Sequence, residues 1–160
     1  MTLVINKFYN KLWTLRFLKR SGIDSDNLLK VYKTVILPSV EYCSEIYDSL
    51  IPTYLSDRLE SVQRQCMKII FGWSVDYHGL ILDGKIKSLQ TRRTEVCTRF
   101  ANRALQSATF GPKWFRRNPA TRDVRQTTRR EFVEKKNKTE RARNNPIQHM
   151  TRLLNQQSSR

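Results

Sequence analysis

The chain has 160 residues, with 30 Lys and Arg against 14 Asp and Glu, which gives a formal net charge of +16 and an isoelectric point near 10.3. This length suits one domain or a small domain with an extension, and no apolar run is long enough to cross a bilayer. Basic residues interrupt positions 1–20, so we expect an intracellular protein, nuclear or cytoplasmic, and not a secreted one. The excess charge favours a polyanionic partner, most simply nucleic acid, over an anionic membrane surface.

Apolar residues recur at helical spacing from the start of the chain. A first helix face is formed, at spacings of three and four, by Ile5, Phe8, Leu12 and Leu15. Gly22 is expected to end this helix in a left-handed conformation. Asp24 and its neighbours offer caps for a second helix, and Pro38 should kink or break it.

The clearest periodicity comes next, and it predicts a third helix that ends at Gly72. Thr53 and Ser56 are candidate caps for it, and its core face is formed by Leu55, Leu59, Val62, Cys66 and Ile69. Ser88 is expected to cap a last helix whose inward face contains Leu89, Val96, Cys97, Phe100, Ala101 and Ala104. The sequence therefore predicts an all-α fold, a small bundle of four to five helices.

A change in composition at Gly111 predicts how the chain is divided. Residues 111–160 contain 14 basic and four acidic residues and few large apolar ones. We therefore predict a helical domain over residues 1–110 and a basic extension over residues 111–160. The extension is expected to be partly disordered or helical and to order only against a partner.

Motifs for catalysis, metals and cofactors are not recognised. The three cysteines, Cys43, Cys66 and Cys97, are too far apart for a zinc motif, and neither His78 nor His149 is close to a pair of them. We therefore predict no metal site and no cofactor. Glu41, Glu45 and Asp48 are spaced to share a helix face, as a two-metal nuclease would require, but the favoured interpretation is a solvated acidic face beside basic neighbours.

Cations beside apolar helix faces are candidates for contact with a phosphate backbone. On the predicted last helix they are Arg92, Arg99 and Arg103, and on the first helix they are Lys7 and Lys11. A solvated surface with no ligand is an equal alternative for both groups.

The extension begins with aromatic residues among cations. Trp114, together with Arg116 and Arg117, could stack unpaired bases while holding phosphate. The alternative is that Trp114 and Phe115 fold back onto the helices as a hydrophobic latch. Further candidate cations in the extension are Arg129, Arg130, Arg141 and Arg143. We expect the stretch that contains the first two to bind nonspecifically as an inducible helix.

Several segments, in order, resemble the region that follows the polymerase palm in LINE-type (non-LTR) retrotransposon reverse transcriptases. The first is Lys-Leu-Trp-Thr-Leu-Arg-Phe-Leu-Lys-Arg at 11–20, and others lie at 22–23, 29–38, 41–47, 57–64, 69–72, 88–105, 139–147 and 151–155. Tyr47 stands where the family usually has Trp. Residues 76–84 lack the acidic residues usual there, which weakens the expected helix. The family's catalytic Asp-Asp pair does not occur in this chain.

The resemblance implies the thumb and C-terminal region of such an enzyme, without its palm and therefore without catalysis. The implied function is to grip RNA, DNA or an RNA–DNA hybrid through the phosphate backbone, with the missing palm domain as a further partner. The alternative is a relic or domesticated helical protein-interaction module with no selected role in nucleic-acid binding. An autonomous nuclease that uses the three carboxylates is the third hypothesis, and we expect no such activity.

Overall fold

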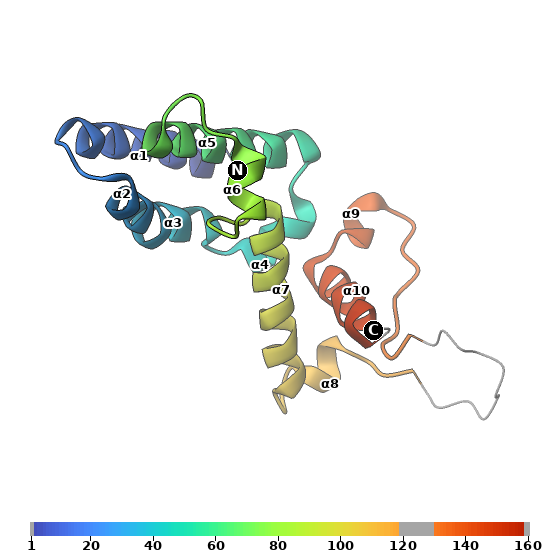
Figure 1. Cartoon of the computed structure of the whole chain (residues 1–160). Coiled ribbons are helices and arrows are strands. Elements are labelled where there is room, and N and C mark those ends of the chain that lie inside the picture. Colours follow the sequence, from blue (N-terminus) through green and yellow to red (C-terminus); the bar gives the residue numbers. More distant parts are fainter. Residues whose placement is uncertain (1, 119–129, 159–160) are drawn as a thin grey trace. The chain divides into compact units, whose positions relative to one another are not determined.

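The computed structural model describes residues 2–118 and 130–158, with side chains from residue 8 onward. It is all-α, 72% helical and without strands in these residues, which confirms the predicted fold class. None of the described helices is both long and apolar enough to span a membrane. The chain forms two compact units (Figure 1): the first unit contains residues 1–44 and 51–93, and the second unit contains residues 45–50 and 94–160.

The first unit begins with the two helices that the sequence predicts. Helix α1 (Thr2–Arg20) ends before Gly22, whose φ of +83° is the left-handed conformation expected of it. Helix α2 (Ser25–Val31) has Asp24 as its N-cap residue, and the carboxylate of Asp24 accepts a hydrogen bond from the backbone N–H of Asn27. This capping bond lowers the pKa of Asp24, because it stabilises the ionised carboxylate.

Pro38 alters the helix instead of ending it. Residues Tyr32–Ile36 are wound as a π-helix (η1), in which the N–H of Leu37 reaches back to the carbonyl of Tyr32. Pro38 lacks an N–H, so the regular α-helical bonding cannot be completed there. Helix α3 (Leu37–Glu41) follows with Pro38 in its first turn, where a missing N–H is tolerated.

Helix α5 (Thr53–Phe71) lies beside α1 and completes most of the core of the first unit (Figure 1). It ends at Gly72 as predicted, but neither Thr53 nor Ser56 caps its start. The N-cap residue is Pro52, and its side chain forms no capping hydrogen bond. Ser56 instead accepts a hydrogen bond from Arg93, which is buried.

The buried residues of the first unit come from all of its longer helices. From α1, α2, η1 and α3 they include Phe8, Leu12, Leu15, Leu28, Tyr32, Ile36 and Val40, and from α5 they include Leu59, Val62, Cys66, Met67 and Ile70. Helix α6 (Tyr77–Leu82) adds Leu80. The helix predicted to be weak is present, because Asp76 caps it by accepting hydrogen bonds from His78 and Gly79.

Helix α7 (Leu89–Gln106) starts in the first unit and continues in the second. Ser88 caps it as predicted, by accepting a hydrogen bond from the N–H of Thr91. Of the six residues assigned to its inward face, Leu89, Cys97, Ala101 and Ala104 are buried, and Val96 and Phe100 are partly buried.

Besides its part of α7, the described part of the second unit contains several short helices and one longer helix. The short elements are the turn η2 (Asp48–Leu50), most of α4 (Ser44–Tyr47), α8 (Gly111–Trp114) and α9 (Glu140–Arg143), and the longer one is α10 (Pro146–Ser158). Its apolar core is formed by Ala101, Ala104, Phe115, Phe132, Met150 and Leu154.

The structure divides the chain elsewhere than at the predicted boundary. Gly111 is buried inside the second unit, and the described part of residues 111–160 supplies most of that unit's core. Of the basic stretch 122–138, predicted to be an inducible helix, residues 122–129 are outside the described residues, and residues 130–138 are not helical in the absence of a ligand. The low apolar content of residues 111–160 did not indicate this core, because only a few large apolar side chains form it. These side chains pack against the small side chains of Ala101 and Ala104, which allow α7 to approach closely.

Candidate nucleic-acid interface

The outer face of α1 carries two exposed aromatic rings that alternate with two arginines along the helix. Trp13 and Phe17 are 68% and 54% exposed, and their rings stack with centroids 5.5 Å apart and planes 15° from parallel. Arg16 and Arg20 are also exposed. The four positions follow each other at spacings of three, one and three, which places them on one side of a helix. We call these four residues the α1 stripe.

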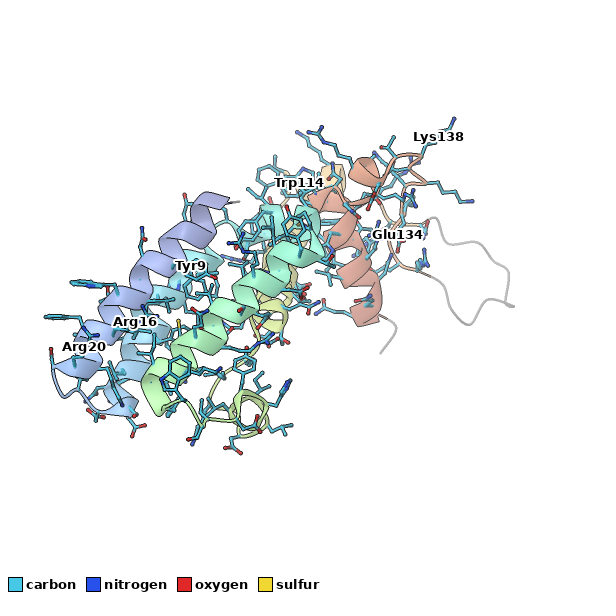
Figure 2. The ribbon with its side chains drawn as sticks, turned by 90° about the horizontal axis from the view of Figure 1, so that it is seen from above. Tyr9, Arg16, Arg20, Trp114, Glu134 and Lys138 are labelled. Atoms are coloured by element: carbon cyan, nitrogen blue, oxygen red, sulfur yellow. The ribbon has the colours of Figure 1, made fainter. Side chains whose placement is uncertain are left out.

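The α1 stripe is distinct from the face that holds the first unit together. Among the described side chains of α1 the buried ones are Phe8, Leu12 and Leu15, whereas Arg16 and Arg20 (labelled in Figure 2) are exposed. Exposed aromatic rings beside arginines offer both a stacking surface and cations for phosphate. The sequence analysis did not select this group, although the i, i+4 spacing of both pairs could have identified it.

Two of the cations predicted in the first unit have partners within it. The ammonium group of Lys11 donates a hydrogen bond of 3.0 Å to the carbonyl oxygen of Val35. The guanidinium group of Arg92 forms a bidentate ion pair with Glu41, in which Nε donates to Oε1 and Nη2 donates to Oε2. Lys7 lies in α1, but its side chain is outside the described residues.

The acidic segment after α3 does not form one helix face. Glu41 ends α3, and Cys43 has a φ of +58°, so the chain turns before Glu45 and Asp48. Glu41 pairs with a basic residue, as expected, but the predicted solvated face is not present, because the side chains of Glu41 and Asp48 are only 15% and 11% exposed. Asp48 instead lies near Cys97 and His149, two residues that the sequence analysis considered separately.

Two predicted arginines in the second unit are directed to solvent. Arg99 and Arg103 are exposed one turn apart on α7. Neither forms an ion pair or hydrogen bond with another described residue, so both are available for an anion. Of the three arginines predicted on this helix, Arg99 and Arg103 are therefore available, whereas Arg92 is paired with Glu41.

The aromatic residues around α8 are packed together. Trp114 (labelled in Figure 2) is partly buried, with its ring centroid 4.9 Å from that of Phe110, and Phe115 is 3% exposed in the core of the second unit. Phe115 therefore follows the hydrophobic-latch alternative. Trp114 is partly exposed, and its ring also lies near those of Phe100 and Phe115.

The remaining predicted cations follow this aromatic group along the chain. Arg116, Arg141 and Arg143 are exposed. Arg117 lies 3.6 Å from Glu131, and Arg130 lies 2.9 Å from Glu134, both in solvent-exposed ion pairs. Such pairs are weak and break easily in favour of a phosphate. Arg129 is outside the described residues.

The first unit thus presents the α1 stripe, and the second presents exposed arginines on α7 and α9. The resemblance to LINE-type reverse transcriptases rests on the sequence motifs alone. No protein-family model, no curated protein sequence and no solved structure matches this chain.

Proposed function

We propose that this chain binds nucleic acid, as the helical template–primer-gripping part of a retrotransposon reverse transcriptase, with the α1 stripe as a principal contact. The observation that carries the proposal is the exposed, stacked pair of Trp13 and Phe17 on the same side of α1 as two exposed arginines. The net charge of +16 and the ordered sequence motifs support the same conclusion.

The two kinds of side chain in the stripe supply different parts of the binding energy. Arg16 and Arg20 neutralise phosphates and release counterions, a contribution that falls steeply with salt. Trp13 and Phe17 stack on an exposed base or pack on a sugar, a contribution of about 1–3 kcal/mol per base that salt hardly changes. Neither contribution reads the base sequence, which suits a surface that must hold any template.

The exposed arginines of the second unit are candidates for separate electrostatic contacts with phosphate. Arg99, Arg103, Arg116, Arg141 and Arg143 are all exposed. Arg92 and Lys11 are not assigned to it, because both are bonded within the first unit. The proposed binding is therefore distributed over many cations, with the stacking energy concentrated in α1.

The test is fluorescence anisotropy with a labelled RNA–DNA hybrid that has a short single-stranded end, measured over a range of salt concentrations. The double variant Arg16→Gln/Arg20→Gln should lower the slope of log affinity against log salt by up to about two. The matched control Lys33→Gln/Arg58→Gln removes two exposed charges from the same unit and should change the affinity less.

The aromatic contribution has its own control. Trp13→Ala should weaken binding about tenfold at every salt concentration. Trp73→Ala removes a ring that is 85% exposed in the same unit, outside the stripe, and should leave binding near that of the wild type. Absence of binding at low salt, or equal losses in the stripe and control variants, would overturn the proposal. The exposed rings would then be better explained as a contact with another protein.

A further inference from the structure

Three side chains with metal-binding atoms meet inside the second unit. They are Asp48 of η2, Cys97 of α7 and His149 of α10, and one ligand atom from each lies within 4.8 Å of the others. Oδ2 of Asp48 is 3.5 Å from Nε2 of His149 and 4.0 Å from Sγ of Cys97. About fifty positions separate each residue from the next along the chain, so the cluster is a product of the tertiary fold.

The cluster is shielded from solvent. Cys97 is fully buried, and the side chains of Asp48 and His149 are 11% and 25% exposed. Nε2 of His149 is itself inaccessible and forms no hydrogen bond with any described residue. Burying an imidazole nitrogen without a hydrogen bond is unfavourable, so an additional ligand for this atom would stabilise the fold.

We propose that Asp48, Cys97 and His149 bind a zinc ion. Thiolate sulfur, imidazole nitrogen and carboxylate oxygen are the three ligand types that zinc takes in proteins. Tetrahedral zinc, with bonds of about 2.0–2.3 Å, sets its ligand atoms about 3.3–3.7 Å apart. The 3.5 Å between Oδ2 of Asp48 and Nε2 of His149 is already in that range, and Sγ of Cys97, 4.0 Å from the same oxygen, would have to move closer when the ion binds.

The charges also balance at this position. When zinc binds, the thiol of Cys97 releases its proton, so a thiolate and the carboxylate of Asp48 together neutralise the two positive charges of the ion. Three protein ligands leave the fourth position to water or to a ligand from a partner. The ion would join η2 to α7 and α10 and so stabilise the second unit.

The same three residue types also occur in nucleophilic cysteine enzymes, but the geometry here is different. In such a triad the imidazole lies between thiol and carboxylate and uses one ring nitrogen for each. Here the thiol and Nε2 both approach the same carboxylate oxygen. Three ligand atoms that all lie within 4.8 Å of one another are close enough to share one ion.

The test uses the full chain, purified with a chelator and kept reduced, and titrated with Co²⁺ in the absence of nucleic acid. We expect stoichiometric binding with a thiolate-to-cobalt charge-transfer band and the visible bands of a tetrahedral site, and Zn²⁺ should displace the cobalt. Cys97→Ser should lose the charge-transfer band. Cys43→Ser and His78→Gln, which alter an exposed cysteine and an exposed histidine in the first unit, should retain it.

A second variant keeps the test decisive if Cys97→Ser does not fold. Asp48→Asn retains the thiol and the imidazole and should weaken zinc binding by tenfold or more, measured by competition with a chromophoric chelator. The proposal is overturned if the folded wild type shows no thiolate band, if Cys43→Ser removes the band, or if Asp48→Asn binds zinc as tightly as the wild type. None of these outcomes depends on nucleic-acid binding, so the two proposals succeed or fail separately.

Discussion

The side-chain amide of Asn155 pairs with both backbone polar groups of Phe132. Its Oδ1 accepts a hydrogen bond of 2.9 Å from the N–H, and its Nδ2 donates one of 3.1 Å to the carbonyl oxygen. Both residues are almost fully buried. The amide thus substitutes for a neighbouring strand, and it holds the extended segment around Phe132 against α10.

Asn155→Ala should therefore destabilise the second unit. The change leaves a buried N–H and a buried carbonyl of Phe132 without these partners, at a cost of about 2–3 kcal/mol in the free energy of unfolding. The measurement is chemical denaturation followed by circular dichroism. Gln156→Ala, at the next and exposed position of α10, is the control and should change stability by less than about 0.5 kcal/mol. Equal effects of both substitutions would contradict this account.

Gly111 is required because backbone passes close to it. A Cβ atom at this position would lie 2.4 Å from the carbonyl oxygen of Leu105, so Gly111→Ala must displace either α8 or the end of α7. We expect a loss of about 1–3 kcal/mol in unfolding free energy, as for other overpacked sites. Lys113→Ala, in the same short helix but exposed, should have little effect. A Gly111→Ala protein as stable as the wild type would show that the two segments separate easily.

The ion pair between Arg92 and Glu41 should contribute measurably to the first unit. A double-mutant cycle with Arg92→Gln and Glu41→Gln should give a coupling of about 1 kcal/mol, because the two side chains are 33% and 15% exposed and the pair is two-pronged. The same cycle on the more exposed pair of Arg130 and Glu134 should give about 0.3–0.5 kcal/mol. The reverse order of the two couplings would be inconsistent with these roles.

Stability should fall in alkaline solution because of a buried thiol. Burial raises the pKa of Cys66 to about 12 from an ordinary value of 9.0. Below pH 9 the thiol is neutral in both the folded and unfolded states, and its contribution to stability is fully present. Above pH 9 the unfolded chain ionises first, so stability is lost progressively as the pH rises toward 12. Burial also raises the pKa of Tyr32 and Tyr77, which adds to the loss at higher pH.

The measurement is the melting temperature between pH 7.5 and 10.5, roughly bracketing the ordinary thiol pKa. Cys66→Ala should show a shallower decline than the wild type, because one of the contributing groups is gone. Cys43→Ser replaces an exposed thiol and should leave the slope unchanged. A slope that responds only to Cys43 would refute the assignment to Cys66.

Local signals in the sequence were sufficient for the predicted helices of the first 110 residues. Asp24, Gly22, Gly72 and Ser88 act where their chemistry predicts, because caps and left-handed turns depend on neighbouring residues alone. The π-helix before Pro38 was not predicted, because a kinked α-helix and a local π-helix can both accommodate a proline that lacks a backbone N–H.

Contacts between segments that are far apart in the chain could not be predicted from the sequence patterns. The pairing of Arg92 with Glu41 joins residues 51 positions apart, and that of Asn155 with Phe132 joins residues 23 apart. Charge spacing on one helix could not distinguish Arg92 from the exposed Arg99 and Arg103, because the distinguishing partner lies on another helix. The α1 stripe, in contrast, depends on local spacing, so it could have been predicted from the sequence.

Residues 45–50 belong to the second unit although the chain on both sides of them belongs to the first. During synthesis this segment leaves the ribosome long before α10, the last described helix of its unit. Residues 1–93 can therefore begin to fold while a piece within them still lacks its partners. For the same reason no single cut separates the two units, and a fragment of residues 94–160 would lack Asp48. Work on isolated pieces of this protein needs residues 45–50 supplied in the same chain as α10.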